Sequence, residues 1–239
     1  MISNLAATLA LRNRALDLTV CTTGSVTLSV TTTGYARADG GSFVTDGFVV
    51  GMEILAAGFT AAGDNGNGII TALTATAMAV DAYTVTLGPT GYTVAARTLV
   101  TEAAAAARTI SVKLPAMRAW ENTTFTPVTG KPYLEEDYVP ATMTLISAPA
   151  RNGEVTETGL YVLKVYGLSG KGIAALRKSV DALRLLYAPG TTMTAGAHTV
   201  RVRTDVSTQT GQIIPLDGGW SVLTLTVPWW AMSTNVIAA

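Results

Sequence analysis

The stretch that decides the fold is GLYVLKVYG (159–167), followed after a short turn by IAALRKSVDALRLLY (173–187). The first part is typical of a β-strand because it is rich in branched and aromatic residues. The second part predicts an amphipathic helix that ends before Pro189-Gly190, because its apolar residues recur at steps of three and four. These residues are Ile173, Leu176, Val180, Leu183 and Tyr187.

Further strands are expected on both sides of this pair. They are TISVKL (109–114), a run around 138–147, HTVRVRT (198–204) and WSVLTLTV (220–227). Residues 1–18 contain an apolar pattern with roughly helical spacing, which predicts a second amphipathic helix. We therefore expect an α+β fold, a mixed β-sheet flanked by helices, formed by residues 1–18 and 108–239.

Between these two segments, residues 19–107 have a different composition, rich in Thr, Val, Ala and Gly. Short alternating runs such as SVTLSVT (25–31) and AYTVTL (82–87) are separated by glycine-containing turns. This predicts an inserted all-β domain, either a barrel or a sandwich. The run Ala103–Ala107 is either a short helical connector or a continuation of the first helix, and the sequence leaves both open.

The chain is unusually poor in charge: of its 239 residues only 13% are charged, and its mean hydropathy is +0.37. Such a protein must hide much of its surface. No run approaches the roughly 18 apolar residues of a membrane-spanning helix, so we expect contact with other protein subunits, where charge is depleted. The net charge of zero argues against nucleic-acid binding as a main task.

Reactive groups are few, and none forms a recognisable catalytic set. His198 is expected to be a structural or surface histidine, and Cys21 has no signature of a nucleophile. The acidic triplet 135–137 is interpreted as a solvated turn rather than a metal site, and 64–68 (DNGNG) as a hairpin turn rather than a calcium loop. We expect no catalytic residue, no cofactor and no metal, and no enzymatic activity.

Aromatic and basic residues are better candidates, for a protein interface. Trp229 and Trp230 point to opposite faces of a strand, so either one enters the core while the other meets a neighbour, or both are core residues. Trp120 is expected to pack internally, with Glu121 and Asn122 fixing its turn. The complete set of candidates is Trp120, Glu121, Asn122, Arg201, Arg203, Trp229 and Trp230.

Four stretches, taken in order, resemble the tail-terminator (minor tail) family of long-tailed bacteriophages. They are RAWEN (118–122), PYLEE (132–136) leading to Val139-Pro140, ETGLY (157–161), and the closing strand from Gly219-Trp220 to Val227-Pro228-Trp229. Simpler members of that family have a short connection where this chain has its insert. Within the insert, FVVGM (48–52) and the glycine-rich residues up to 71 resemble a β module that recurs in phage virion proteins.

The resemblance implies a subunit of a homo-oligomeric ring, typically six-fold, that sits on the last ring of the tail tube. Such a ring contacts the tail-tube protein and the head-tail completion or connector protein at the head-proximal end of the virion tail, after assembly in the host cytoplasm. Arg201 and Arg203 are then a solvated face, an ion-pairing strip between subunits, or a strip toward the lumen where DNA passes. Two alternatives stay open: a tail-tube or head-tail connector subunit, and a receptor- or carbohydrate-binding module that uses the insert.

Overall fold

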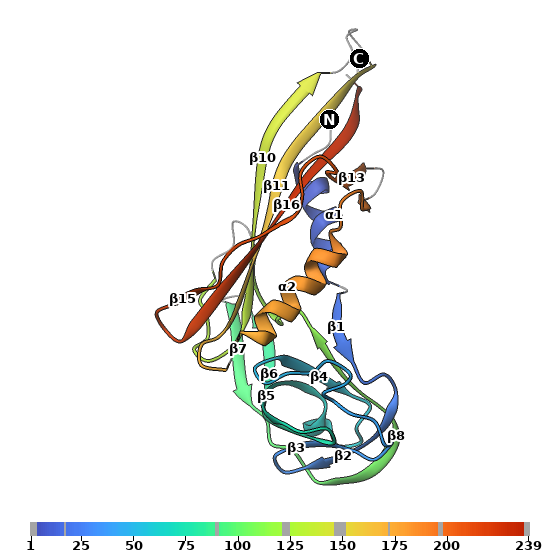
Figure 1. The fold of residues 1–239 in the computed structure, drawn as a ribbon, viewed down its shortest axis with the longest axis vertical. Helices are drawn as coiled ribbons and strands as arrows, with labels where there is room; N and C mark the ends of the chain where they lie inside the picture. The colour runs from blue at the N-terminus through green and yellow to red at the C-terminus, as the bar shows by residue number, and fades with distance from the viewer. Residues whose placement is uncertain are drawn as a thin grey trace.

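The computed structural model describes residues 4–16, 18–88, 91–120, 125–145, 152–171, 173–195 and 198–236. The molecule is elongated, with a β-barrel at one end and a long twisted sheet at the other (Figure 1). Two helices lie against one face of the long sheet. Strands between residues 19 and 113 form the barrel, and strands between residues 117 and 236 form the upper sheet.

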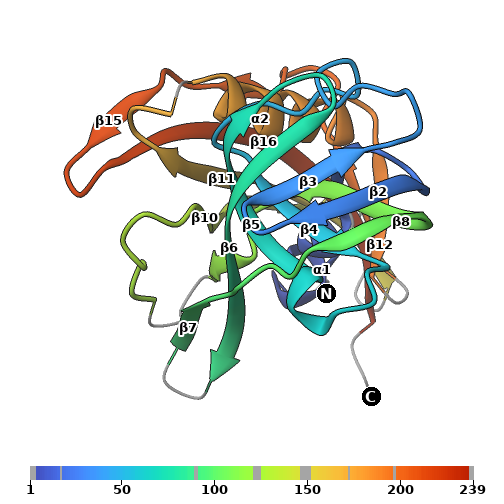
Figure 2. The same ribbon diagram turned by 90° about the horizontal axis from the view of Figure 1, so that it is seen from below.

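The barrel is closed because its last strand pairs with strands on both of its edges. Going around, the order is β8-β2-β3-β6-β5-β4, and β4 pairs again with β8, while β1 pairs with β8 and β7 with β6. Figure 2 shows from below how β6 and β7 leave the barrel as a hairpin. The strands are β1 (Thr19–Thr22), β2 (Val26–Thr31), β3 (Gly34–Arg37), β4 (Glu53–Ala57), β5 (Gly66–Leu73), β6 (Ala77–Gly88), β7 (Gly91–Ala96) and β8 (Glu102–Lys113).

The barrel has a core of its own, built from aromatic and branched side chains that alternate along the strands. Phe43 and Phe48 meet edge to face with ring centroids 5.7 Å apart. The buried hydroxyl of Tyr35 donates a hydrogen bond of 2.8 Å to the carbonyl oxygen of Asp64. This single contact fastens β3 to the loop between β4 and β5 (58–65), which includes a short 3-10 helix, η1 (Ala62–Asp64).

The upper sheet is built around three long antiparallel strands in the order β10-β11-β16. β11 and β16 are each 17 residues long and pair along their whole length, from Asn152↔Val236 to Leu168↔Trp220. Shorter strands pair at the edges: β9 parallel to β10, and β13, β14 and β15 in succession along β16. The strands are β9 (Met117–Ala119), β10 (Tyr133–Leu145), β11 (Asn152–Leu168), β12 (Thr192–Ala195), β13 (His198–Val202), β14 (Gln209–Thr210), β15 (Ile214–Leu216) and β16 (Trp220–Val236).

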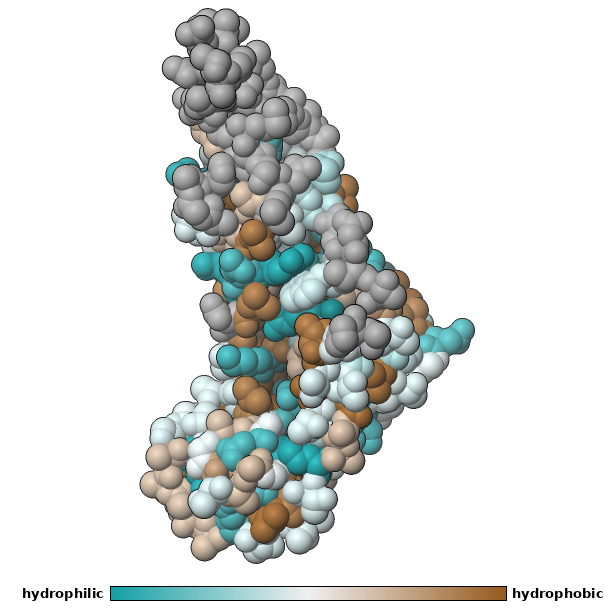
Figure 3. All heavy atoms as spheres, turned by 180° about the vertical axis from the view of Figure 1, so that it is seen from behind, coloured by the Kyte–Doolittle hydropathy of each residue, from teal (hydrophilic) through white to brown (hydrophobic). Residues whose placement is uncertain are grey.

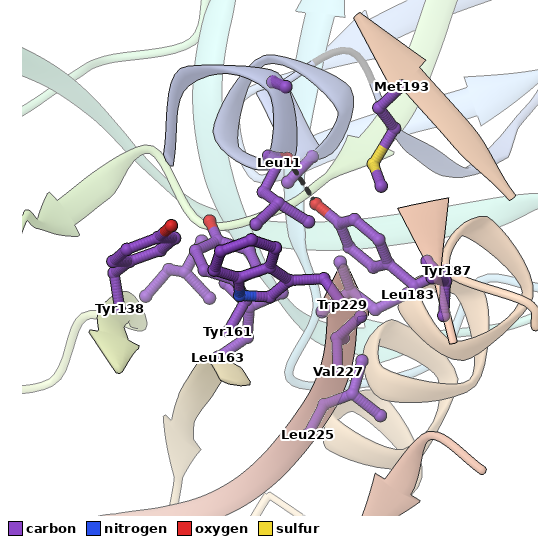
Figure 4. Close-up of a cluster of buried hydrophobic side chains, with 14 of the residues drawn as sticks. Leu11, Tyr138, Tyr161, Leu163, Leu183, Tyr187, Met193, Leu225, Val227 and Trp229 are labelled. Atoms are coloured by element: carbon purple, nitrogen blue, oxygen red, sulfur yellow. Dashed lines mark hydrogen bonds between the residues drawn. The ribbon is translucent and has the colours of Figure 1, made fainter. Parts of the chain in front are cut away.

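The helices α1 (Asn4–Leu16) and α2 (Ala174–Leu186) form the core of this end with the sheet. Both helices were predicted and are confirmed. Figure 4 shows Trp229 at the centre of the cluster, and the hydroxyl of Tyr187 directed toward α1, where it donates a 2.5 Å hydrogen bond to the carbonyl oxygen of Leu11. Leu176, Leu183 and Tyr187 are buried as predicted, whereas Ile173 is 44% exposed because it precedes the part of α2 that packs on the sheet.

The expected fold class, a mixed sheet flanked by helices with an all-β insert, was wrong. The described part of the chain is mostly β, with sixteen strands and two α-helices, and consists of a closed six-stranded barrel and a half-barrel. The run Ala103–Ala107 is neither of the two helical alternatives but part of β8, because β8 pairs with β2 along this stretch and continues beside β4. The division into 1–18 with 108–239 and 19–107 stays a prediction, and its second boundary falls inside β8.

The barrel is packed firmly against the upper sheet. The β6–β7 hairpin contributes Val85, Tyr92 and Val94 to an apolar cluster that includes Tyr133 and Trp220 of the sheet. On the other side, the ammonium of Lys178 on α2 donates a 2.6 Å hydrogen bond to the carbonyl oxygen of Gly47. These contacts join the two ends of the molecule into one body.

Candidate subunit interface

The face of the upper sheet that the helices leave uncovered, here called the outer face, is the best candidate for a contact with another subunit. Because neighbours in register share a face, Val139, Leu160 and Pro228 lie side by side across the three long strands. Val139 is 46% exposed and Leu160 is 38% exposed. Neither residue was predicted to lie at an interface. Val139 lies in the stretch 132–140 that resembles the tail-terminator family, and strand alternation alone would have grouped it with the other residues on the outward face.

The same face carries a tryptophan and an arginine next to this apolar pair. Trp230 is paired in register with Thr158 on one side and Arg201 on the other. The guanidinium of Arg201 lies over the indole ring, 5.5 Å from its centroid, a favourable cation–π contact. Met232, two residues further along β16, is 45% exposed. The outer face therefore has an apolar centre with a cation at its edge.

Toward the barrel the outer face becomes charged. Lys164 of β11 forms ion pairs of 2.7 Å with Glu135 and with Asp137 of β10. These two ion pairs raise the pKa of Lys164 although burial acts in the opposite direction. Figure 3, which views the molecule from the side opposite Figure 1, shows hydrophobic and hydrophilic residues side by side along its middle. Apolar centre and charged margin together are the arrangement found in protein interfaces.

The interpretation of residues 135–137 as a solvated turn was wrong, because they lie within β10. Alternation along the strand sends Glu135 and Asp137 to the outer face and Glu136 into the core. There the carboxylate of Glu136 pairs with Arg12 of α1 and accepts a 2.7 Å hydrogen bond from the hydroxyl of Tyr161. Glu136 thus ties α1 to the sheet and has a structural role.

The two neighbouring tryptophans lie on opposite faces of β16. Trp229 is 1% exposed and stacks on Tyr138 with ring centroids 5.2 Å apart, so it is a core residue. Trp230 is half-buried on the outer face. Of the two, Trp230 is therefore the residue that can meet a neighbour.

The remaining candidates are scattered. Trp120 is half-buried between two cations: Arg12 lies 4.4 Å and Arg118 5.5 Å from its ring centroid. Arg203 forms an ion pair with Asp205 two residues later, which lowers the pKa of Asp205. Glu121 and Asn122, and the side chain of His198, lie outside the described residues. Trp120 and Arg203 thus already have partners within the chain.

The polar residues of the barrel are engaged in holding its loops. Asp64 is fully buried and accepts a 2.8 Å hydrogen bond from the backbone N–H of Val100. The amide of Asn65 bonds to both the N–H and the carbonyl of Phe59. β4 and β5 do form a hairpin, but its connection is a loop over 58–65 rather than the tight turn predicted at 64–68.

Over the described part of the chain, no group of three His, Cys, Asp or Glu residues is arranged to hold a metal ion. Burial raises the pKa of the Cys21 thiol to about 11, so the thiol is protonated at neutral pH. No helix in the described ranges is long and apolar enough to cross a membrane.

The comparison with known families falls on the part of the chain that carries the outer face. Residues 99–229, more than half of the chain, match the family described as phage tail terminator protein. The chain belongs to the phage tail terminator family. The match runs from just before β8 to Trp229 of β16, so it covers most of the upper sheet together with α2, whereas α1 and β1–β7 lie outside it.

Family membership makes this protein a structural component of a phage tail and confirms the resemblance seen in the sequence. The resemblance of residues 48–71 to a phage virion module stays a prediction. None of the curated proteins compared with the chain matches it. One solved structure without a functional name is similar, at 26% identity with a TM-score of 0.37, over 50% of this chain and 79% of its own.

Proposed function

We propose that this terminator-family protein is the subunit of a closed homo-oligomeric ring that caps the phage tail tube and joins it to the head-completion proteins. Family membership supports a structural role in the tail. The observation that carries the finer proposal is the outer face, where Val139, Leu160 and Met232 are each more than one-third exposed next to Trp230. In a chain with only 13% charged residues, such a face is best explained by a neighbouring subunit that covers it.

A finite ring requires a heterologous contact, in which the outer face of one subunit meets a different surface of the next and the rotation closes. Six copies are the number that the family resemblance implies. One side of the ring then contacts the tail-tube protein and the other side the connector protein, at the head-proximal end of a tail assembled in the host cytoplasm. DNA that passes through the ring makes brief contacts only, in keeping with the zero net charge.

In this proposal the barrel projects outward from the ring rather than into its lumen. The barrel lies at one end of the elongated molecule, and the apolar part of the outer face lies on the upper sheet beyond it (Figure 1). Residues of intermediate hydropathy cover most of the barrel surface seen in Figure 3, which suits a surface exposed to water.

The proposal is tested by measuring the mass of the purified protein in solution and imaging it by electron microscopy, alone and mixed with tail tubes. We expect closed rings, either free or at tube ends, and tubes that stop growing once capped. Long stacks formed by this protein alone would instead identify a tail-tube subunit. A monomer that never caps tubes would refute the ring.

A charged substitution on the outer face tests whether the ring contact uses this surface. We expect Leu160→Asp to abolish ring formation while the circular dichroism spectrum of the subunit is unchanged, because an unpaired charge at an interface core is strongly unfavourable. Leu87→Asp is the matched control, since Leu87 is 66% exposed on the β6–β7 hairpin of the barrel. Equal ring formation by both variants would show that the ring, if present, uses another surface.

A further inference from the structure

A second surface, on the helical side of the upper sheet, has the features of a peptide-binding groove. It runs between α2 and the chain around Thr210–Ile213, has a volume of about 670 Å³, and is floored in part by Leu223. We call it the α2 groove. It lies on the face opposite the outer face, because Leu223 belongs to the core under α2.

One wall of the α2 groove is positively charged. Arg177, Asp181 and Arg184 recur at steps of four and three, so they share one exposed face of α2. Neither arginine has an ion-pair partner within the part of the chain that the structure describes, whereas Arg12, Arg37, Arg108 and Arg203 elsewhere in the molecule all do. Two free guanidinium groups in one groove make it complementary to carboxylates.

The opposite wall is formed by residues 210–213, which begin in the edge strand β14. β14 pairs with β16 through Gln209 and Thr210, and in the described residues no strand pairs with its other edge. A free strand edge can accept an added strand through backbone hydrogen bonds. Ile173 and Ile213 provide apolar contacts at the groove. A segment that pairs with this edge is extended, and acidic side chains along it face the two arginines of the other wall.

We propose that the α2 groove binds an extended acidic segment of another virion protein. Arg177 and Arg184 are seven residues apart, about 10 Å along the helix axis. An extended chain advances about 3.3 Å per residue. Carboxylates two or four residues apart, about 7 or 13 Å, are therefore within reach of both flexible arginine side chains.

The segment comes from a different protein rather than from a second copy of this chain. Among the acidic side chains that the structure describes, most are buried or ion-paired, and no extended stretch presents two free carboxylates at that spacing. Nucleic acid fits less well, because two arginines on a chain with no net charge are far fewer cations than a surface that follows a phosphate backbone carries.

The test uses the full-length protein and a capped, fluorescently labelled hexapeptide of sequence TVEVET, with TVQVQT as its uncharged control. Binding is followed by fluorescence anisotropy. We expect TVEVET to bind and TVQVQT to bind at least ten-fold more weakly. Arg177→Gln and Arg184→Gln should each weaken TVEVET binding about ten-fold, because each removes a charge-assisted hydrogen bond.

Lys171→Gln is the matched control, because it removes an exposed cation that does not line the groove. It should leave TVEVET binding unchanged. No binding of TVEVET at millimolar concentration, or equal binding by the double variant R177Q/R184Q, would overturn the proposal. The proposal would also be overturned if a short DNA duplex bound in a manner that depends on Arg177 and Arg184 while binding of the peptide did not depend on them. Peptide binding does not require a ring, so R177Q/R184Q tests the groove and Leu160→Asp tests the outer face separately.

Discussion

Glu53, at the start of β4, should make the stability of the protein fall as the pH rises. It is 7% exposed; one carboxylate oxygen accepts a 2.9 Å hydrogen bond from the Asn67 amide, and the other a 3.2 Å bond from the N–H of Ala116. Burial nevertheless raises its pKa from the ordinary 4.5 to about 7. The hydrogen bonds and the charge of Lys131 act in the opposite direction but do not offset burial.

The size of the effect follows from linkage. In the unfolded chain Glu53 ionises above about pH 4.5, whereas in the folded protein it keeps its proton up to about pH 7. The favourable contribution of the protonated group is therefore complete below pH 4.5 and is lost as the pH rises through 7. At 1.36 kcal/mol for each pKa unit, the free energy of unfolding falls by about 3 kcal/mol between pH 4.5 and 8.

Glu53→Gln removes this pH dependence, because glutamine has nearly the same shape and carries no charge. Urea unfolding of both proteins at pH 5, 6, 7 and 8 gives the difference in free energy of unfolding. Other titrating groups, such as Asp64, whose pKa is also raised by burial, are common to both proteins and cancel in the difference. We expect the variant to gain about 2.5 kcal/mol relative to wild type from pH 5 to pH 8. Parallel profiles would refute the reasoning.

Three further predictions concern packing and the thiol. Gly159→Ala should destabilise the fold by about 1–3 kcal/mol in thermal unfolding, because the new Cβ would lie 2.5 Å from the ring of Trp229. Gly88→Ala is the control and should cost less, because the nearest atom to its new Cβ is 3.5 Å away; equal losses of stability would contradict this. Trp229→Ala should lower the free energy of unfolding in urea by about 3–5 kcal/mol, and Trp230→Ala should lower that of the monomer by only roughly 1 kcal/mol, since only Trp229 is fully buried. A larger loss for Trp230→Ala would show that the core lies on the face of β16 that carries Trp230. Alkylation of Cys21 by iodoacetamide should follow an apparent pKa near 11, and a value below 9 would show that the thiol is not desolvated.

The sequence predicted those elements whose apolar pattern reflects packing against one other surface. α2 was predicted because its apolar stripe reflects one contact with the sheet, and Leu176, Val180 and Leu183 are all buried. The run Ala103–Ala107 was missed for the opposite reason. Alanine favours a helix in isolation, but here its conformation is set by pairing with β2, a contact that no local pattern records. Ala107 even adopts a φ of 62°, a conformation that non-glycine residues rarely take.

The candidate interface could be predicted from the sequence only in part, and the reason is geometric. Alternation along a strand fixes which residues share a face, so it separated Trp229 from Trp230 and would have separated Glu136 from its neighbours. Alternation does not say which face is covered. That depends on where α2 packs, more than forty residues away in the sequence from Trp229.

Once α2 is placed, the outer face differs in composition from a sheet face exposed to water. A face left to water in a stable monomer would be expected to carry polar residues at nearly all positions. Instead Val139, Leu160 and Met232 remain exposed on the outer face, while the polar pairs formed by Lys164 lie nearer the barrel. This uneven distribution, apolar where the long strands run free and charged near the barrel, is the pattern expected of a surface that another subunit covers in part.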